Sequence, residues 1–406
     1  MLALPLLLLG AAAAAAAAPT PRDDLNPYPD GWRLTFSPDG KFKLVHFTDL
    51  HFAERGLFYE YWPEGDVRGQ KSIGVMDGVL ADEHPQFIVY GGDQINGESA
   101  LYDNVTTYLD WAFSPALKAN TPFATVYGNH DESYNISHIL SFQHESTYAA
   151  AKHLSWTQRN PASSPDPRGA FNYYIPVYAD AAATTPSLLL WFFDSRSGVF
   201  SSGKFWIIDE PWMTEDWVHQ ASARWLNETA DAMKAKWGAL PKSLAFVHIP
   251  PTAALTINLA EVGLNPGEHP GLRGEPTTNQ GRKAGYWQSA GDGPFWAAVS
   301  GTLGGADGQG LIALTAGHDH LNDWCGRTPA VGPYTYCYGR HTGYGGYGDL
   351  PRGSRVFEAH LAKDGKLANV RSWIRLEDHT TQNTNLLVVD GNTTLVNTAD
   401  PAPSSF

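Results

Sequence analysis

Cysteine, positive charge and long apolar runs are all scarce in this sequence, and each scarcity excludes a class of protein. The 406 residues include only two cysteines, Cys325 and Cys337, which lack a CxxC pair and so do not form a zinc knuckle. Basic residues number 28 against 42 acidic ones, and no basic block stands out. A nucleic-acid backbone or an anionic membrane is therefore not expected as the main partner.

The sequence also lacks the marks of membrane spans, repeats and separate domains. After the first residues, no run is long or apolar enough to cross a bilayer. We find no internal repeat and no linker that would divide the chain, and no Gly-X-Ser-X-Gly elbow that would mark a serine nucleophile. The composition, 43% hydrophobic and 17% charged, is typical of a globular protein with a substantial core. Solubility is sufficient to explain the net charge of −14.

Residues 1–18 have the form of a secretory signal peptide. A leucine-rich segment is followed by an alanine run, and no Lys or Arg precedes them. A retained membrane anchor is the alternative, although the apolar segment is short for a span. A secretory route predicts a secreted, extracellular or vacuolar location. It also makes four Asn-X-Ser/Thr triplets candidate glycan sites, which are Asn104, Asn135, Asn227 and Asn392.

The same route permits a disulfide between Cys325 and Cys337. Such a bond would close a short loop and stabilise the fold by about 3 kcal/mol in the chain-entropy model. Two free, buried thiols are the alternative.

The order of apolar runs and helical patterns predicts an α/β fold. In the first third, strands are expected at 41–47, 87–90 and 122–127, helices at 71–84 and 105–119, and a loop at 53–70. Further along, strands are expected at 187–193, 243–247, 311–315, 334–338, 354–361 and 368–376. Helices are expected within 137–157, after a cap at Thr214, and from residue 296. The long segment 258–294 either shapes a substrate pocket or is a solvated surface loop.

Five apolar strands are each followed by a side chain that can bind a metal ion. These side chains are Asp49 and His51, Asp93, Asn129, His248, and His318 with His320. In open α/β sheets ligands bind outside the carboxyl ends of the strands, so the five clusters are expected at one edge. Two carboxylates, one amide oxygen and four imidazoles are too many for one tetrahedral ion but fit two ions that share a carboxylate. This mixture of donors suits Zn, Mn and Fe better than Ca or Mg.

Taken singly, each cluster has an ordinary structural explanation. Asp-x-His pairs occur in solvated loops, His-x-His on surface strands, and Gly-Gly-Asp in turns. Asn129 could form an Asx-turn, and His248 could be a core histidine bonded to a backbone carbonyl. The conjunction of all five clusters, in this order, favours a metal site.

With this set of motifs, the chain resembles the calcineurin-like metallophosphoesterases. The resemblance rests on five motifs in family order, which are Asp49-x-His51, Gly92-Asp93, Gly128-Asn129-His130-Asp131, His248 and Gly317-His318-x-His320. The later segments 322–325, 337–339 and 343–348 resemble the secreted fungal and plant branch related to purple acid phosphatases, which includes the Dcr2-like phosphatases. The resemblance implies an αββα sandwich of two mixed β-sheets flanked by helices. It would form a single catalytic domain over residues 32–378, followed by a tail of low structure at 379–406.

The resemblance also implies a role for each residue. The first metal ion would be held by Asp49, His51, Asp93 and His320, and the second by Asp93 as a bridge, Asn129, His248 and His318. His130 would lie beside the phosphate, where it stabilises the transition state or protonates the leaving oxygen, and Asp131 would orient its ring. Purple acid phosphatases have a tyrosine that binds Fe(III) where this chain has Asn96. We therefore expect a colourless protein with Zn, Mn or Fe(II) ions.

These roles imply a metal-dependent hydrolase of phosphate esters. The expected substrate is a small phosphorylated molecule, in the first place a phosphomonoester. A phosphodiesterase or nucleotidase with the same metal centre is the alternative. A catalytically silent binding protein is a further alternative, and the complete set of donors argues against it.

Overall fold

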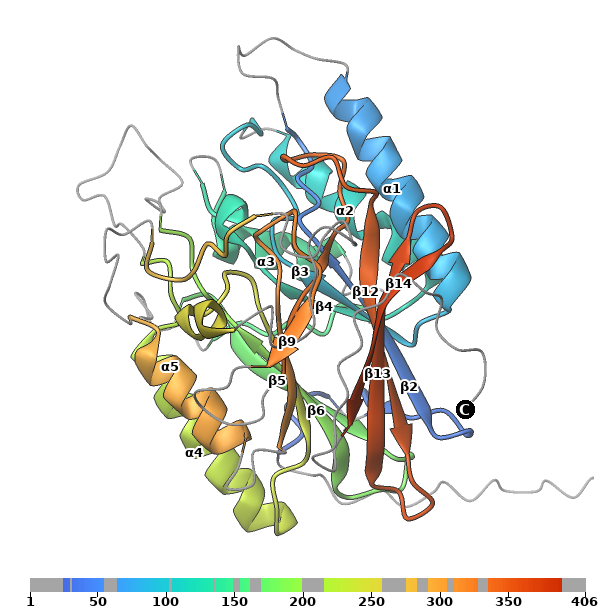
Figure 1. The fold of residues 1–406 in the computed structure, drawn as a ribbon, viewed down its shortest axis with the longest axis vertical. Helices are drawn as coiled ribbons and strands as arrows, with labels where there is room; N and C mark the ends of the chain where they lie inside the picture. The colour runs from blue at the N-terminus through green and yellow to red at the C-terminus, as the bar shows by residue number, and fades with distance from the viewer. Residues whose placement is uncertain are drawn as a thin grey trace, which may run out of the picture.

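Two β-sheets packed face to face, with helices on both outer faces, make up the protein (Figure 1). The structure, a computed structural model, describes residues 25–29, 31–54, 64–101, 104–133, 136–148, 154–160, 169–198, 215–257, 275–282, 291–304, 310–327 and 335–388. The first sheet has the strand order β1-β5-β6-β7-β8-β10-β9, and the second has the order β14-β13-β12-β2-β3-β4, with β11 also paired to β2.

The first sheet is mixed. Its strands are β1 (Leu34–Thr35), β5 (Asn172–Tyr178), β6 (Pro186–Phe193), β7 (Ser243–Val247), β8 (Leu311–Ala316), β9 (Cys325–Arg327) and β10 (Thr335–Tyr338). Strands β6, β7, β8 and β10 run parallel to one another, whereas β5 and β9 run antiparallel to their neighbours β6 and β10. The carboxyl ends of the parallel strands therefore meet at one edge.

The second sheet is mixed in the same way. Its strands are β2 (Lys41–Thr48), β3 (Phe87–Gly91), β4 (Phe123–Val126), β11 (Arg340–His341), β12 (Gly353–Leu361), β13 (Leu367–Leu376) and β14 (Thr381–Val388). Strands β2, β3 and β4 are parallel, and β12, β13 and β14 continue the sheet as an antiparallel meander.

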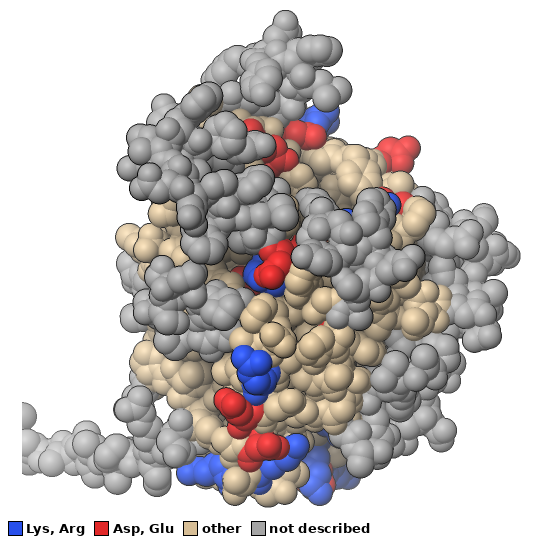
Figure 2. Space-filling view, turned by 90° about the vertical axis from the view of Figure 1, so that its left-hand side faces the viewer, with Lys and Arg blue, Asp and Glu red and all other residues tan. Residues whose placement is uncertain are grey.

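Helices cover both sheets. They are α1 (Glu64–Glu83), α2 (Val105–Ala119), α3 (His138–Tyr148), α4 (Gln220–Trp237) and α5 (Gly293–Ala298), with short helical turns η1 (Asn129–Asp131), η3 (Thr252–Thr256) and η4 (Val299–Leu303). Helices α1 and α2 pack on the second sheet, and α4 and α5 pack on the first (Figure 1). Seen from the side of α4 and α5, acidic and basic side chains lie next to one another, as on an ordinary solvated surface (Figure 2).

Strand β2 shows how the sequence builds these layers. Its side chains alternate, so that Phe42 and Leu44 enter the core between the sheets. Val45 and Phe47 point the other way, into the core beneath α1 and α2. The predicted αββα sandwich is therefore confirmed. Among the described residues, no helix combines the length and the apolar character needed to span a bilayer.

Helix α1 begins seven residues before the predicted start at residue 71. The glycines and charged residues of its first two turns interrupt the apolar pattern, which is why a loop was predicted there. Gly69 nevertheless packs against Trp111 and Phe52, where an added Cβ would lie 3.1 and 3.2 Å from their ring atoms. Close packing of the helix explains the absence of a side chain at this position.

Five of the strands that the structure describes were not predicted, namely β1, β5, β9, β11 and β14. Pro176 interrupts the apolar run of β5, but β5 has a long partner only in β6, since its pairing with β1 involves only two residue pairs. Strand β14 lies within the segment 379–406 that was expected to have low structure. It pairs with β13 through its backbone, so the sheet continues past residue 378, and residues 389–406 lie outside the described part.

The predicted cap at Thr214 lies outside the described residues. Helix α4 begins instead after His219, whose Nδ1 accepts a hydrogen bond from the Ala221 N–H at 3.1 Å. Of the long segment 258–294, the structure describes 275–282 and 291–294. Cys325 and Cys337 lie opposite each other on β9 and β10 and form a disulfide, which resolves the alternative of free thiols.

Candidate metal centre

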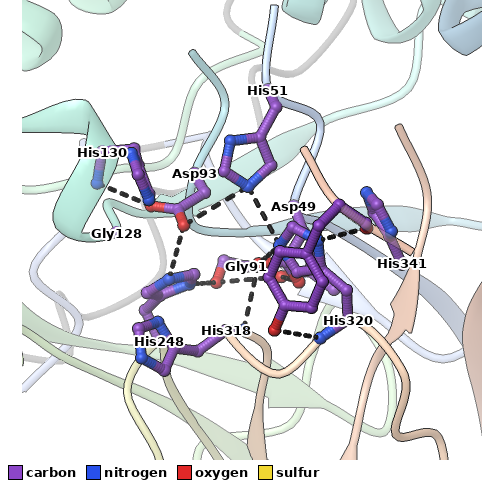
Figure 3. A network of polar contacts seen from close by, with 12 residues as sticks. Asp49, His51, Gly91, Asp93, Gly128, His130, His248, His318, His320 and His341 are labelled. Atoms are coloured by element: carbon purple, nitrogen blue, oxygen red, sulfur yellow. Dashed lines mark hydrogen bonds and ion pairs between the residues drawn. The ribbon is translucent and has the colours of Figure 1, made fainter. Parts of the chain in front are cut away.

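The polar clusters that follow β2, β3, β4, β7 and β8 meet at one edge of the sandwich (Figure 3). Among the described residues, three overlapping groups have potential metal-binding atoms within 4.8 Å of one another. They are Asp49, His51 and His320; His51, Asp93 and His130; and Asp93, His248 and His318. Asn129 stands in the turn that carries His130. The structure thus brings six of the seven predicted ligands together, with Asp93 shared between groups, and the seventh, Asn129, lies in the adjoining turn.

Left-handed backbone conformations aim several of these side chains. The φ angles are 56° at Asp49, 48° at His51, 53° at Asp93 and 76° at His318. Such conformations cost about 1–3 kcal/mol each in a residue with a side chain, and they persist only where the surroundings enforce them. Here Asp49 N–H donates to Gly92 O at 2.9 Å and His51 N–H donates to Asp93 O at 2.9 Å. The strained turns are the kind found at functional sites.

At the first metal position, two imidazoles face each other. His51 Nε2 lies 3.1 Å from His320 Nε2. The other nitrogen of each ring is occupied, because His51 Nδ1–H donates to Asn96 Oδ1 at 2.5 Å and His320 Nδ1–H donates to Tyr347 O at 2.8 Å. Both Nε2 atoms therefore direct lone pairs into the same small space. Asp49 Oδ1 and Asp93 Oδ2 lie at its edge, each 3.6 Å from one of these nitrogens.

The second metal position also has a histidine whose Nδ1–H is held by an acceptor. His248 Nδ1–H donates to Gly91 O at 2.9 Å, which leaves Nε2 as an acceptor that lies 3.1 Å from Asp93 Oδ2. Within the described part of the chain, Asn129 Oδ1 is buried and makes no hydrogen bond, and His248 Nε2 has the Asp93 carboxylate beside it. Buried acceptors without donors are costly. A cation among these groups would satisfy them, and the mixed N and O donors suit Zn, Mn or Fe.

Electrostatics point the same way. Burial raises the pKa of Asp49 to about 7, with His248 opposing the shift and Asp93 adding to it. Burial lowers the pKa of His51 to about 4, against the opposing effect of Asp93. The charged forms of Asp49 and His51 are therefore poorly stabilised by the groups around them. A bound cation would favour ionised Asp49 and neutral His51, the forms in which both residues bind metal.

His130 stands at the open side of the centre, but Asp131 does not orient its ring. The carboxylate of Asp131 instead accepts hydrogen bonds from Gly128 N–H at 2.7 Å and Ile95 N–H at 3.0 Å, and so it holds the turn. His130 Nδ1–H donates to Glu98 Oε1 at 2.5 Å, and its backbone N–H donates to Asp93 Oδ1 at 2.8 Å. The ring-orienting role predicted for Asp131 therefore belongs to Glu98.

Sequence reasoning missed the residues that support the ligands. Asn96 was noted only as the replacement for a tyrosine, and it holds His51. His341 and Tyr347 enclose His320, with ring centroids 4.0 and 4.1 Å from it. The glycine-rich run 343–348 was a usable signal, because its glycines permit close approach.

An added Cβ on Gly345 would lie 2.2 Å from His51 O, and one on Gly346, where φ is 73°, would lie 2.5 Å from His320 Cε1. The run can therefore lie directly on two candidate ligands only because it lacks side chains at these positions.

The chain is similar in sequence to several known proteins. The family model of the calcineurin-like phosphoesterases matches residues 42–253. "Probable inactive purple acid phosphatase 29" of Arabidopsis thaliana is 26% identical over 369 residues, which cover 85% of each chain. "Probable inactive purple acid phosphatase 28" of the same plant is 28% identical over 375 residues, 85% of this chain and 83% of that one. "Phosphatase DCR2" of Saccharomyces cerevisiae is 27% identical over 357 residues, 85% of this chain and 55% of the yeast protein.

The region matched by the family model makes up more than half of the chain. It contains the motifs of Asp49, Asp93, Asn129 and His248, which the structure brings to one edge. The fold agrees with the family, since both sheets and the helices on their outer faces are those expected from the resemblance. The chain therefore belongs to the calcineurin-like phosphoesterase family.

Proposed function

We propose that this protein hydrolyses phosphomonoesters at a centre of two metal ions. The observation that carries the proposal is the pair of Nε2 atoms of His51 and His320, 3.1 Å apart, with both Nδ1 atoms already donating. With both Nδ1–H groups donating, two Nε2 lone pairs face each other, and a cation bound to both would stabilise this arrangement. The ions would be Zn, Mn or Fe, held by Asp49, His51, Asp93 and His320 and by Asp93, Asn129, His248 and His318.

When bound, the two ions supply a water nucleophile of lowered pKa and offset the charge of the phosphoryl oxygens. The protein provides the rest. Asp93 would bind at both metal positions, and its Oδ1 accepts a hydrogen bond from the His130 N–H, which holds His130 beside them. No serine or cysteine nucleophile is needed, because the attacking group is water.

His130 has the position of a general acid. Because its Nδ1–H is bonded to Glu98, we assign the proton transfer to Nε2. Its side chain is 34% exposed, unlike those of the buried ligands. As the P–O bond to the leaving group breaks, the proton on His130 Nε2 passes to the leaving oxygen. Glu98 keeps the ring in the orientation that this transfer requires.

Two relatives are named as probable inactive purple acid phosphatases, while a third is named a phosphatase. We propose that this chain is catalytically active. A silent binding protein would have no need of both metal positions together with His130. Asn96 supports divalent ions in place of an iron–tyrosinate pair, because its amide is engaged with His51.

The test of function combines elemental analysis of the purified protein with assays on p-nitrophenyl phosphate and bis-p-nitrophenyl phosphate. We expect two equivalents of transition metal per chain and faster turnover of the monoester. Faster turnover of the diester would assign the protein to phosphodiesterases. Metal without turnover of either ester, or of a nucleoside monophosphate, would favour the binding protein.

We further propose that the chain enters the secretory pathway and is secreted or delivered to a vacuole. The apolar leader, the disulfide and the triplets at Asn104 and Asn227 support this route. The triplets at Asn135 and Asn392 lie outside the described residues. Cleavage after residue 18 and a mass shift on glycosidase treatment are the expected results in a eukaryotic host. An uncleaved leader that keeps the protein in membranes would support the anchor instead.

A further inference from the structure

His138, the first residue of α3, lies behind the turn that carries Asn129 and His130. Its side chain is buried, and its Nε2–H donates to Gly128 O at 2.7 Å. On the other side of the same residue, Gly128 N–H donates to Asp131 Oδ2 at 2.7 Å. The backbone of Gly128 is therefore held at both its N–H and its carbonyl group, directly before the two functional residues.

The second nitrogen of His138 reaches the other sheet. His138 Nδ1 lies 3.4 Å from Oδ1 of Asp194, the acid that follows β6, and 3.3 Å from Oε2 of Glu132. Asp194 belongs to none of the candidate metal-binding groups, although it too follows a strand at the same edge. His138 thus links the end of β6 in the first sheet to the turn after β4 in the second.

Asp194 is itself fixed. It is fully buried, and its carboxylate accepts hydrogen bonds from Ala170 N–H at 2.7 Å and Arg196 N–H at 2.8 Å. Gly169 passes so close that an added Cβ would lie 2.3 Å from Asp194 Oδ2. An acid with this many backbone donors is a rigid anchor for the imidazole beside it.

The surroundings keep His138 cationic. Burial alone would lower its pKa, but Glu132 and Asp194 outweigh burial and raise the pKa of His138 to about 10. An imidazolium carries a proton on both nitrogens. One proton serves Gly128 O and the other faces the two carboxylates, which a neutral ring could not do.

We infer that His138 is a positioning residue for the second metal position, since it fixes the Gly128 carbonyl and thereby the place of Asn129. Asn129 Oδ1 makes no hydrogen bond within the described residues, so its position depends on the turn that carries it. Without His138, the carbonyl of Gly128 would keep only the 3.2 Å hydrogen bond from Asp131 N–H, and the turn would hold Asn129 less firmly at the centre. The inference rests on the two-metal centre of the proposed function but not on any substrate.

The test compares His138→Leu with His138→Gln in metal-free protein, by calorimetric titration with Zn²⁺. Gln can still donate to Gly128 O from an amide nitrogen at the reach of Nε2, whereas Leu cannot. We expect Leu to weaken one of the two binding steps by about tenfold or more and to leave the other near the wild-type value, and Gln to recover most of the loss. The matched control is His144→Leu on the same helix, where His144 Nε2–H donates to Asp110 Oδ1 at 2.6 Å. This control should bind both ions like the wild type.

Wild-type affinities in His138→Leu, or an equal loss in His144→Leu, would overturn the inference. Near-ultraviolet circular dichroism first establishes that each variant is folded. If His138→Leu does not fold, His138→Gln is compared with His138→Asn, whose amide is too short to reach Gly128 O, and equal affinities in that pair would overturn the inference. A wild type that binds two ions but hydrolyses no phosphate ester would contradict the proposed function alone.

Discussion

Glu98 accepts the Nδ1–H of His130 at 2.5 Å and so determines which nitrogen of that ring can meet a substrate. The two residues are 32 positions apart in the sequence, and neither is buried as deeply as Asp93 or His51, with side chains 37% and 34% exposed. A carboxylate in this place holds the orientation of the ring without binding a metal ion. It therefore offers a way to change proton transfer while leaving the metal centre intact.

Replacing Glu98 with Ala should lower kcat about 10- to 100-fold for an alkyl phosphate, whose leaving oxygen needs a proton. The loss should be much smaller for p-nitrophenyl phosphate, whose leaving group departs as an anion. The kcat of Glu98→Gln, which keeps an oxygen acceptor, should lie between those of the wild type and Glu98→Ala. Steady-state rates with both substrates and the metal content of each variant provide the measurement. An equal loss for both substrates, or a loss of metal, would contradict a role in proton transfer.

Asn96→Ala should weaken the first metal position, because His51 Nδ1–H would lose its acceptor and the ring its orientation. Partners of this kind are typically worth 10- to 100-fold in metal affinity. Competition with a chromophoric chelator measures the change. The control is Gln86→Ala, which removes an amide bonded to the backbone of β2 at Lys41 and Lys43, away from the metal centre. If both variants hold metal as the wild type does, Asn96 has no such role.

Asp93→Ala should remove both ions and reduce turnover by three orders of magnitude or more, since the shared carboxylate serves both positions. Asp292→Ala is the matched control, because Asp292 is also buried and its carboxylate bonds to Thr252 N–H and Oγ1–H. Elemental analysis and the monoester assay are run on both variants. Normal metal content in Asp93→Ala would remove the basis of the two-metal centre.

Stability should depend on Glu358 in a pH-sensitive way. The hydrogen bond from His360 lowers the pKa of Glu358 from 4.5 to about 2, with Lys43 adding to the shift and burial opposing it. A carboxyl group whose folded pKa is depressed stabilises the fold above its unfolded pKa and loses that contribution as the pH falls through the folded value. Glu358→Gln should therefore cost about 1 kcal/mol at pH 6, and the difference from the wild type should shrink between pH 4.5 and pH 2. Urea unfolding across this range measures it, and a difference that stays constant would refute the assignment.

The predictable part of the site was the part encoded by strand ends. Asp49, Asp93 and His248 each follow an apolar run directly, and the parallel topology brings such positions together. The supporting residues were not predictable in this way, because their contacts join distant segments. Tyr347, for example, bonds through its hydroxyl to Glu275, 72 positions away, and its ring stacks on His320.

The errors in the predicted fold have similar causes. No element was predicted where β5 lies, and Pro176 stands in that strand, which has a long partner on only one side. The loop predicted at 53–70 included the first turns of α1, where Gly69 packs against Trp111. In both cases a tertiary contact decides the structure. The role assigned to Asp131 failed for a related reason, since adjacency in the sequence does not establish which donors a carboxylate meets.

The division of the candidate ligands between the two sheets has a consequence for handling the protein. Asp49, Asp93 and Asn129 follow strands of the second sheet, whereas His248, His318 and His320 follow strands of the first. Ions bound between these residues would link the two sheets. The free energy of metal binding would then contribute to the free energy of folding. A chelator would then lower the melting temperature as well as the activity. Protein produced in metal-poor medium would also unfold at a lower temperature than the metal-loaded protein.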